Sequence, residues 1–402
     1  MANKKISQLA SSATLTGTEE LPLVQGGVTL KTTSQDIANL AGGLFEEGTG
    51  GAASTQRVGS SNLADGVSST VGGGISNTAS GNYSIVSGGT TNTASGYYAT
   101  VGGGQGNTAS SYYATVGGGY INQATADSST VSGGDENTAS GEYSSVGGGD
   151  ENIASGEYST VGGGYQNTAS DYAATIGGGS SNEASASYST VGGGSNNQAI
   201  GGTSIVGGGY GNIASAATST IGGGNENQAS GSSSTIGGGS NNQASGDYSI
   251  IGGGDGNEAS EVQSTIGGGI SNTASGYRST IGGGYYNVAS SDTSTVGGGF
   301  FNTASGPSST ISGGEDNIAS GFKSFIGGGQ MNVASAENSA IVGGAYNNTS
   351  TFASTIIAGS GITADQSGCT FVSKLSIKSI PTSAAGLPSG SVWNNGGVLN
   401  IV

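Results

Sequence analysis

The chain has 402 residues, of which 84 are glycine, 8% are charged and 6% are aromatic. Glycine loses the most backbone freedom on folding and brings no side chain to bury, so an ordinary globular core is not expected. The formal charge of −17 opposes binding to nucleic acid and to anionic membrane surfaces, because both partners require Lys and Arg.

Residue types needed for several kinds of site are missing. There is no histidine, and Cys369 is the single cysteine, which excludes an intrachain disulfide, a His/Cys metal site and a histidine-based catalytic triad. We expect no cofactor. Residues 1–17 lack the apolar run of a secretory signal, and no stretch reaches the roughly 18–20 apolar residues that span a bilayer. These features predict a soluble protein made in a cytoplasm, without membrane insertion.

Residues 1–48 predict a small N-terminal module that differs in composition from the rest of the chain. The segment LPLVQGGVTL, residues 21–30, predicts short apolar strands. Ser34 is a predicted helix N-cap, and the helix would continue through Ile37 and Leu40. We expect this module to cap the repeats that follow.

A fifteen-residue repeat fills residues 56–371. Its anchor is a Val or Ile that recurs from Val71 to Ile341, in nineteen copies without insertion or deletion. Weaker copies flank the array, with Asn62 and Ala64 before it and Ile356 and Ala364 after it. Loops normally tolerate insertions, so this register requires each repeat to align with its neighbours. Fifteen residues are too few for helical repeats, which need about 33 or more. The sequence predicts an all-β fold, a parallel β-solenoid of about 19–21 coils.

The invariant columns predict the interior of a thin coil. The residue two before each anchor is always Ser or Ala, so the two lie on the same face of a strand. Position +8 is Ala in every repeat except at Thr349, and it would face the anchor from the opposite strand. Positions +2 and +3 are always Gly-Gly, which indicates a turn with positive φ or a close backbone approach.

An asparagine occupies position +6 of all nineteen repeats, including Asn77, Asn92, Asn107, Asn167 and Asn347. As a structural residue it would adopt a left-handed turn conformation and stack into an amide ladder. As a functional residue it would bind a ligand along the array. We favour the structural interpretation, because no binding site needs nineteen copies.

Position −1 is Thr in thirteen of the nineteen repeats. A regular threonine ladder could bind ice, but isolated Ile and Phe residues interrupt this one. We therefore favour a half-buried face that packs on another chain. The candidate inter-chain residues are Thr100, Thr115, Thr130, Thr160, Thr175, Ile205, Ile250 and Phe325.

Two pairs of columns vary freely, at positions +4/+5 and +11/+12, and most of the 17 tyrosines lie in them. Their rings are too bulky for a narrow interior and should point outward, where aromatic faces and carboxylates suit carbohydrate or protein recognition. The alternative interpretation is that these residues serve only strand formation and solubility and recognise no ligand. The candidate recognition residues are Tyr120, Tyr165, Tyr285, Tyr286, Phe300 and Phe301.

Acidic residues cluster in the same columns, at Asp135, Glu136, Glu142, Asp150, Glu151 and Glu157. They could attract cations, but no EF-hand spacing and no calcium-binding GGxGxD repeat is present, so we expect no specific metal site.

Residues 372–402 predict a C-terminal β cap or trimerisation segment. SVWNNGGVLNIV, residues 391–402, predicts a hairpin with Asn395-Gly396 in its turn. We expect Trp393 to have a core role there rather than to bind a ligand.

The repeat pattern NxASGxYSTVGGG resembles the head repeats of YadA-like trimeric autotransporter adhesins over residues 56–371. That family forms left-handed parallel β-rolls with one repeat per coil, and three chains pack around an axis. The fifteen-residue period and the triple glycine depart from the family's repeat of about fourteen. The family's signal peptide, coiled-coil stalk and membrane barrel are not seen in this sequence.

The end modules resemble segments of phage and prophage tail-fibre or appendage proteins. Together these resemblances imply a homotrimeric tail fibre or virion appendage, attached to other virion proteins through residues 1–48, with adhesion to a host-surface glycan or protein. The expected location is the virion. The alternatives are a capsid-decorating or filament-forming protein without a receptor, and an ice-binding solenoid. An enzyme is disfavoured, because the paired carboxylates lie in drifting columns with no insertion to build a cleft.

Overall fold

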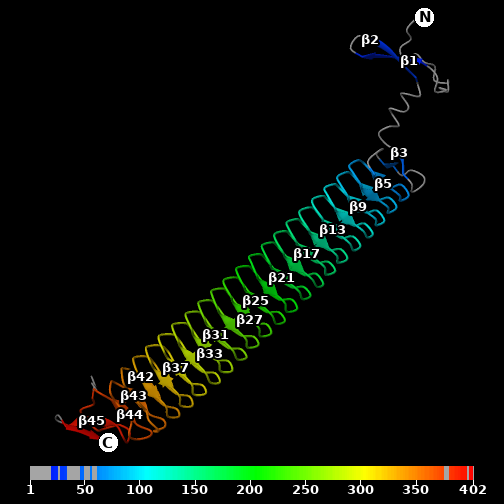
Figure 1. The fold of residues 1–402 in the computed structure, drawn as a ribbon. Coiled ribbons are helices and arrows are strands. Elements are labelled where there is room, and N and C mark those ends of the chain that lie inside the picture. The colour runs from blue at the N-terminus through cyan, green and yellow to red at the C-terminus, as the bar shows by residue number, and fades with distance from the viewer. Residues whose placement is uncertain are drawn as a thin grey trace. The chain divides into compact units, whose positions relative to one another are not determined.

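A computed structural model describes residues 20–25, 28–33, 46–48, 55–56, 61–374, 380–395 and 398–401. The chain divides into two compact units, residues 1–229 and 230–402. The predicted parallel β-solenoid is confirmed: about 21 turns recur at intervals of about 15 residues, and no helix occurs among the described residues (Figure 1). That part of the chain accordingly contains no helix able to cross a bilayer.

Each coil contributes one short strand to each of two parallel sheets. The anchor sheet contains the strands that end on the anchor, and the alanine sheet contains those that end on the position +8 residue. Successive strands pair fifteen residues apart, as in Val161 with Ile176 and Ala169 with Ala184.

In the first unit the anchor-sheet strands are β4 (Thr55–Gln56), β6 (Thr70–Val71), β8 (Ile85–Val86), β10 (Thr100–Val101), β12 (Thr115–Val116), β14 (Thr130–Val131), β16 (Ser145–Val146), β18 (Thr160–Val161), β20 (Thr175–Ile176), β22 (Thr190–Val191), β24 (Ile205–Val206) and β26 (Thr220–Ile221). The alanine-sheet strands are β5 (Leu63–Ala64), β7 (Thr78–Ala79), β9 (Thr93–Ala94), β11 (Thr108–Ala109), β13 (Gln123–Ala124), β15 (Thr138–Ala139), β17 (Ile153–Ala154), β19 (Thr168–Ala169), β21 (Glu183–Ala184), β23 (Gln198–Ala199), β25 (Ile213–Ala214) and β27 (Gln228–Ala229).

In the second unit the anchor-sheet strands are β28 (Thr235–Ile236), β30 (Ile250–Ile251), β32 (Thr265–Ile266), β34 (Thr280–Ile281), β36 (Thr295–Val296), β38 (Thr310–Ile311), β40 (Phe325–Ile326), β42 (Ala340–Gly343), β43 (Ile356–Ala358) and β44 (Thr370–Val372). The alanine-sheet strands are β29 (Gln243–Ala244), β31 (Glu258–Ala259), β33 (Thr273–Ala274), β35 (Val288–Ala289), β37 (Thr303–Ala304), β39 (Ile318–Ala319) and β41 (Val333–Ala334).

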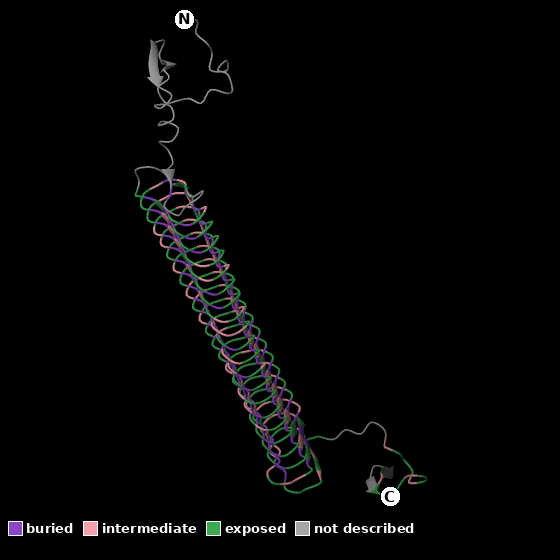
Figure 2. Cartoon of the chain, turned by 90° about the vertical axis from the view of Figure 1, so that its right-hand side faces the viewer, coloured by how far each residue is buried: buried purple, intermediate pink, exposed green. Residues whose placement is uncertain are grey.

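The interior of each coil contains one Val or Ile together with small residues. The anchors Val71 to Ile341 and the position +8 alanines are at most 1% exposed. The Ser or Ala at position −2 is equally buried, for example Ser144 and Ala174. Figure 2 shows this alternation, with buried residues inside the coils and exposed residues along the turns. Each coil therefore encloses only one medium-sized side chain, and the interior of the solenoid is narrow.

The turns contain non-glycine residues in the left-handed region, at positions +5 and +12. The prediction that the position +6 asparagines adopt this conformation was wrong, because the residue before each asparagine takes the positive φ instead. Gln166 has φ 53° and Tyr158 has φ 58°, and the same sign recurs from coil to coil. Strand amides donate to the following coil, as Thr160 N does to Ala174 O at 2.9 Å. The left-handed residues donate in the opposite direction, as Gln166 N does to Asp150 O at 2.9 Å. The positive φ therefore gives these turn amides a partner, at a conformational cost of about 1–2 kcal/mol each.

The position +6 asparagines form a buried ladder that joins three coils. Asn167 N donates to Asn152 Oδ1 at 3.1 Å. Its Nδ2 lies 3.0 Å from Gly163 O and 2.9 Å from Gly179 O, in the following coil. Asn77, Asn92, Asn107 and Asn347 make corresponding contacts and are at most 1% exposed.

The array ends where the register changes. Ile341 pairs with Ile357, sixteen residues on, and a bulge separates Ile341 from Gly343. The prediction that Ile356 continues the anchor column was therefore wrong by one residue: Ile357 is buried and Ile356 is 44% exposed. The preceding turn is one residue longer, which shifts the buried position. Ala364 remains buried.

The terminal segments form antiparallel pairs. The strands β1 (Glu20–Gln25) and β2 (Val28–Thr33) pair with each other, and β3 (Glu46–Glu47) pairs with β4. The strands β45 (Val392–Asn395) and β46 (Val398–Ile401) form the predicted C-terminal hairpin. The predicted helix after Ser34, the turn residue Gly396 and the side chain of Trp393 lie outside the described residues.

The two invariant glycines should respond differently to substitution. A Cβ on Gly179 (φ +98°) would lie 2.1 Å from Gly194 O, whereas one on Gly178 would come no closer than 3.8 Å to Gly163 O. Gly179→Ala should lower the free energy of unfolding by at least about 2 kcal/mol, and Gly178→Ala by much less. Denaturant unfolding of both variants checks this, and equal losses would contradict it.

Two buried serines at position −2 allow a second comparison between matched variants. Ser129 Oγ donates to Ala126 O at 2.6 Å, whereas Ser144 Oγ is buried without a hydrogen-bond partner. Ser144→Ala should preserve or raise the free energy of unfolding, because this column already accepts Ala. Ser129→Ala should lower it by about 1 kcal/mol. The same unfolding measurement tests both, and a larger loss in Ser144→Ala would refute the assignment.

Candidate functional site

The freely varying columns lie on the two turns that flank the anchor sheet. The turn after each anchor holds positions +4 and +5, and the turn before the next anchor holds positions +11 and +12. The +4 residues of successive coils also form isolated parallel bridges, such as Tyr165 with Ser180. Within each unit the variable side chains thus form an edge on a regular backbone.

The six predicted recognition residues are all on the +4/+5 edge and are 36–44% exposed. Tyr120 and Tyr165 lie in the first unit, and the other four lie in the second. Gln105 and Asp135 are the bridge partners of Tyr120, and Asp150 and Ser180 are those of Tyr165. Among the described residues no aromatic ring packs on either tyrosine.

Tyr285, Tyr286, Phe300 and Phe301 form one aromatic cluster across two coils. Tyr285 stacks on Phe300 and Tyr286 stacks on Phe301, each with ring centroids 5.2 Å apart. Within a coil the rings meet edge to face, at 87° for the tyrosine pair. The stacked pairs cover one face of every ring, which leaves only the outer faces for a ligand.

The spacing of the coils explains this geometry. Rings in van der Waals contact are about 3.5 Å apart, but the coils repeat at about 4.8 Å. Stacked rings must therefore tilt by about 45° from the coil axis. When the two columns tilt in opposite senses, their planes become almost perpendicular, as observed. The result is a herringbone packing.

The sequence reasoning missed a larger cluster on the other edge, formed by Tyr83, Tyr97, Tyr98, Tyr112 and Tyr113. Tyr98 stacks on Tyr83 at 5.0 Å and on Tyr113 at 5.1 Å. Tyr97 stacks on Tyr112 at 5.3 Å, and each Tyr-Tyr dipeptide is edge to face. The consecutive YY pairs, fifteen residues apart, were the available signal.

Two phenols of this cluster, Tyr97 and Tyr112, have a raised pKa. Burial of the ring and the neighbouring phenols raise the pKa of Tyr97 above its ordinary value. A side-chain hydrogen bond with Tyr113, followed by burial and the nearby phenols, raises the pKa of Tyr112. These hydroxyls can therefore donate hydrogen bonds at any physiological pH.

The predicted acidic group is divided between the two edges. Asp135, Glu136, Asp150 and Glu151 follow the +4/+5 edge, whereas Glu142 and Glu157 are at position +11. Glu151 accepts a hydrogen bond from Gln166. Among the described residues no three His, Cys, Asp or Glu side chains are grouped as metal ligands would be.

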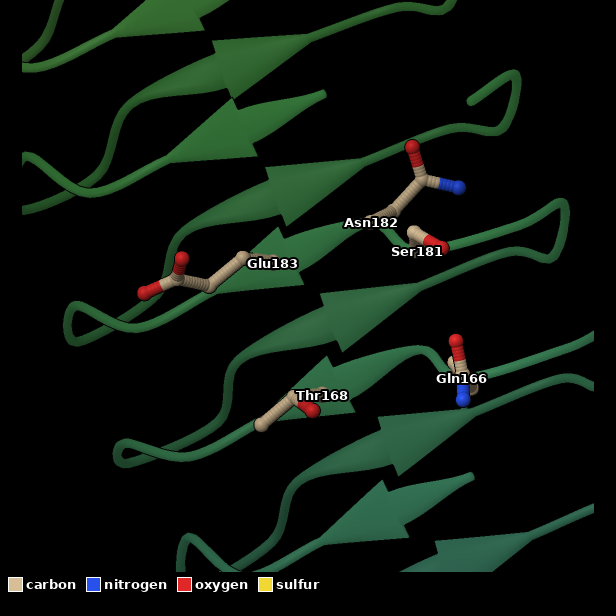
Figure 3. Close-up of a pocket in the computed structure, with 5 residues that line it drawn as sticks. All are labelled: Gln166, Thr168, Ser181, Asn182 and Glu183. Carbon is tan, nitrogen blue, oxygen red and sulfur yellow. The ribbon is translucent and has the colours of Figure 1, made fainter. Parts of the chain in front are cut away.

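A shallow hollow of about 270 Å³ lies on the first unit, lined by Gln166, Thr168, Ser181, Asn182 and Glu183. Figure 3 shows that Glu183 points away from Gln166 and Ser181. The amide of Asn182 is held by Gly178 O and Gly194 O of the ladder. The five lining residues offer polar contacts to a ligand.

The predicted inter-chain residues all lie on the outer face of the anchor sheet. Most of the threonines are half-buried, and Ile205, Ile250 and Phe325 are 39–47% exposed. These residues follow one another along the coils, separated from the interior only by the strand itself.

The tyrosine cluster should stabilise its own coils. Tyr98→Ser removes two stacked contacts, at about 0.5–1.5 kcal/mol each, and should accelerate amide exchange between Tyr83 and Tyr113. Tyr248→Ser is the control, because Tyr248 occupies the same column, is 59% exposed and contacts no other described ring. Hydrogen-exchange mass spectrometry measures both variants. Equal effects would show that ring stacking does not stabilise the coils.

Comparison with known protein families finds a match to one short region of the chain. Residues 129–141 match the model of the "Ubiquitous surface protein adhesin repeat" family. No curated protein matches the chain. The match covers one repeat and supports the resemblance to adhesin head repeats for that region. Together with the regular coils, it fits an adhesin-type structural protein.

Proposed function

We propose that this protein is a structural subunit of a phage tail fibre or related virion appendage, in which three copies pack through their anchor sheets. The trimer would serve as a stiff spacer that displays its variable edges to a host surface. The observation that supports this most strongly is the composition of the anchor-sheet outer face.

That face carries no charge in any of the nineteen repeats. Position −1 is Thr, Ser, Ala, Ile or Phe, and position +1 is Gly, Ser or, once, Val342. Alternation along a strand places both columns on the outer face. Between residues 61 and 373 the sequence has 20 carboxylates, so the absence of charge here is specific to this face.

The alanine sheet provides the contrast within the same coils. Its outward position +7 includes Glu183, Glu258 and several glutamines, such as Gln198. A face in contact with water tolerates such residues, whereas a face in contact with another chain would leave them unpaired and desolvated. The anchor sheet is therefore the surface suited to a second copy.

The small size of the outer residues favours close packing. The glycines at position +1 let a neighbouring backbone approach, and the threonines present a low, regular ridge. The exposed Ile205, Ile250 and Phe325 would become buried in such a contact, at roughly 25 cal/mol for each Å² removed from water. Because every coil contributes equally, the contact would grow with the number of coils.

The terminal hairpins support the virion assignment only through their resemblance to phage proteins. In this proposal residues 1–48 attach the fibre to other virion proteins, and residues 372–402 cap the far end or hold the three chains together. Host adhesion would then depend on the variable edges, which remain exposed in each chain.

Sedimentation of the full-length protein tests the assembly. We expect three times the 38.3 kDa mass of one chain. Thr100→Glu with Thr115→Glu places two carboxylates on the anchor-sheet face and should produce monomers. The matched control is Thr93→Glu with Thr108→Glu, which makes the same change on the alanine sheet of nearby coils and should remain trimeric.

Two results would refute the trimer. If the wild-type protein sediments at the mass of one chain, the protein is not a trimer. Equal dissociation of the two double variants would show that the anchor sheet is not the contact.

A further inference from the structure

We infer that the second unit carries a binding strip for a linear, carboxylate-bearing polysaccharide, formed by Arg278, Thr293, Ser308 and Lys323. This donor strip follows position +12 through four consecutive coils. It extends the adhesion role proposed above by naming a ligand class, but it depends neither on the trimer nor on the virion.

The distribution of positive charge points to this strip. Between residues 61 and 373 there are twenty Asp and Glu residues and only two basic residues, Arg278 and Lys323. Both basic residues occupy position +12, three coils apart, which is on the order of 14 Å at about 4.8 Å per coil. Within these coils the second unit thus concentrates its cations on one edge.

Neither cation is neutralised by a carboxylate. Among the described residues, no Asp or Glu forms an ion pair with Arg278 or Lys323. Arg278 Nε instead donates to the amide oxygen of Gln263 at 2.7 Å. No residue that the structure describes hydrogen-bonds the two terminal guanidinium nitrogens, and their planar fork suits a carboxylate.

An aromatic ring holds each cation in place. The Arg278 guanidinium carbon lies 4.8 Å from the centroid of Tyr277, and Lys323 Nζ lies 4.9 Å from that of Phe322. Both rings come from position +11 of the same turn. Cation–π contact reduces the mobility of a long side chain, so less entropy is lost when it binds a ligand.

Two hydroxyl groups fill the space between the cations. Thr293 Oγ1 and Ser308 Oγ lie 2.9 Å apart. The four side chains are exposed, and their backbones share φ values between +54° and +58°. The amides of Thr293, Ser308 and Lys323 each donate to the preceding coil at 2.7–2.9 Å, which fixes the spacing of the strip.

This arrangement suits an acidic glycan better than other anions. The cations would bind carboxylates at the two ends of a short oligosaccharide segment, and the hydroxyls would bind sugar hydroxyls between them. Asp292 lies beside Thr293, and Glu261 and Glu337 occupy the coils just beyond each end. These carboxylates confine an anionic ligand to the strip and exclude general attraction of polyanions.

Binding of purified full-length protein to polygalacturonate, measured by biolayer interferometry, tests the inference, with neutral dextran as the reference polymer. We expect binding to polygalacturonate only. Arg278→Gln with Lys323→Gln should weaken binding at least tenfold, because Gln lacks the charge. Asp292→Asn should strengthen it several-fold by removing a nearby negative charge.

The control Lys31→Gln with Lys374→Gln removes two positive charges elsewhere and should leave binding unchanged. Gln263 and Asn338 already occupy position +12, so the substitutions in the strip should preserve the coils, which circular dichroism checks. Equal binding to dextran, no binding to polygalacturonate, or undiminished binding by the strip variant would overturn the inference. A monomer that still binds polygalacturonate would refute the trimer and leave the strip intact.

Discussion

The backbone hydrogen bonds between successive coils are the constraint on which each unit depends. Strand amides such as Thr160 N donate to the following coil, left-handed turn amides such as Gln166 N donate to the preceding one, and the pattern recurs every fifteen residues. One extra residue would move both sets out of register. The change at Ile357 shows this effect, because a longer turn there coincides with a bulge and with the end of the regular array. The unbroken spacing is thus a requirement of hydrogen bonding, since the strand amides and the left-handed turn amides bond to carbonyls of adjacent coils.

The asparagine ladder and the glycine column together satisfy the hydrogen bonding of the turns. Asn167 bonds the glycine turn of its own coil and that of the next, which requires the glycine carbonyls to come close. Gly179 cannot carry a side chain because its Cβ would meet that neighbouring backbone. Interior side chains then contribute little volume, so stability is distributed along the coils rather than concentrated in a core. This is typical of repeat proteins, in which each unit contacts only its neighbours.

The residues proposed to bind partners and the residues that maintain the coils occupy different positions in each repeat. The interior and the glycine turn are invariant, whereas the two edges accept tyrosine, phenylalanine, carboxylate or cation without altering the backbone. Charge is excluded from the outer face of the anchor sheet, which suits contact with another copy, and it is allowed on the edges, which suit ligands. The aromatic clusters lie between these roles: their rings stabilise adjacent coils and leave only edges and outer faces for recognition.

The sequence alone determined the β-solenoid, the coil length and the buried columns, because a strict period with invariant small residues has few physical solutions. It also placed Tyr120 and Phe300 on the outside, since their rings cannot fit beside an anchor such as Val116. Only the tertiary structure decided that positions +5 and +12 are left-handed, because Tyr and Gln have no intrinsic preference for that region. It likewise decided the herringbone stacking and the cation–π contacts of Arg278 and Lys323. Those depend on the distance between coils and on side-chain tilt, which a linear sequence does not contain.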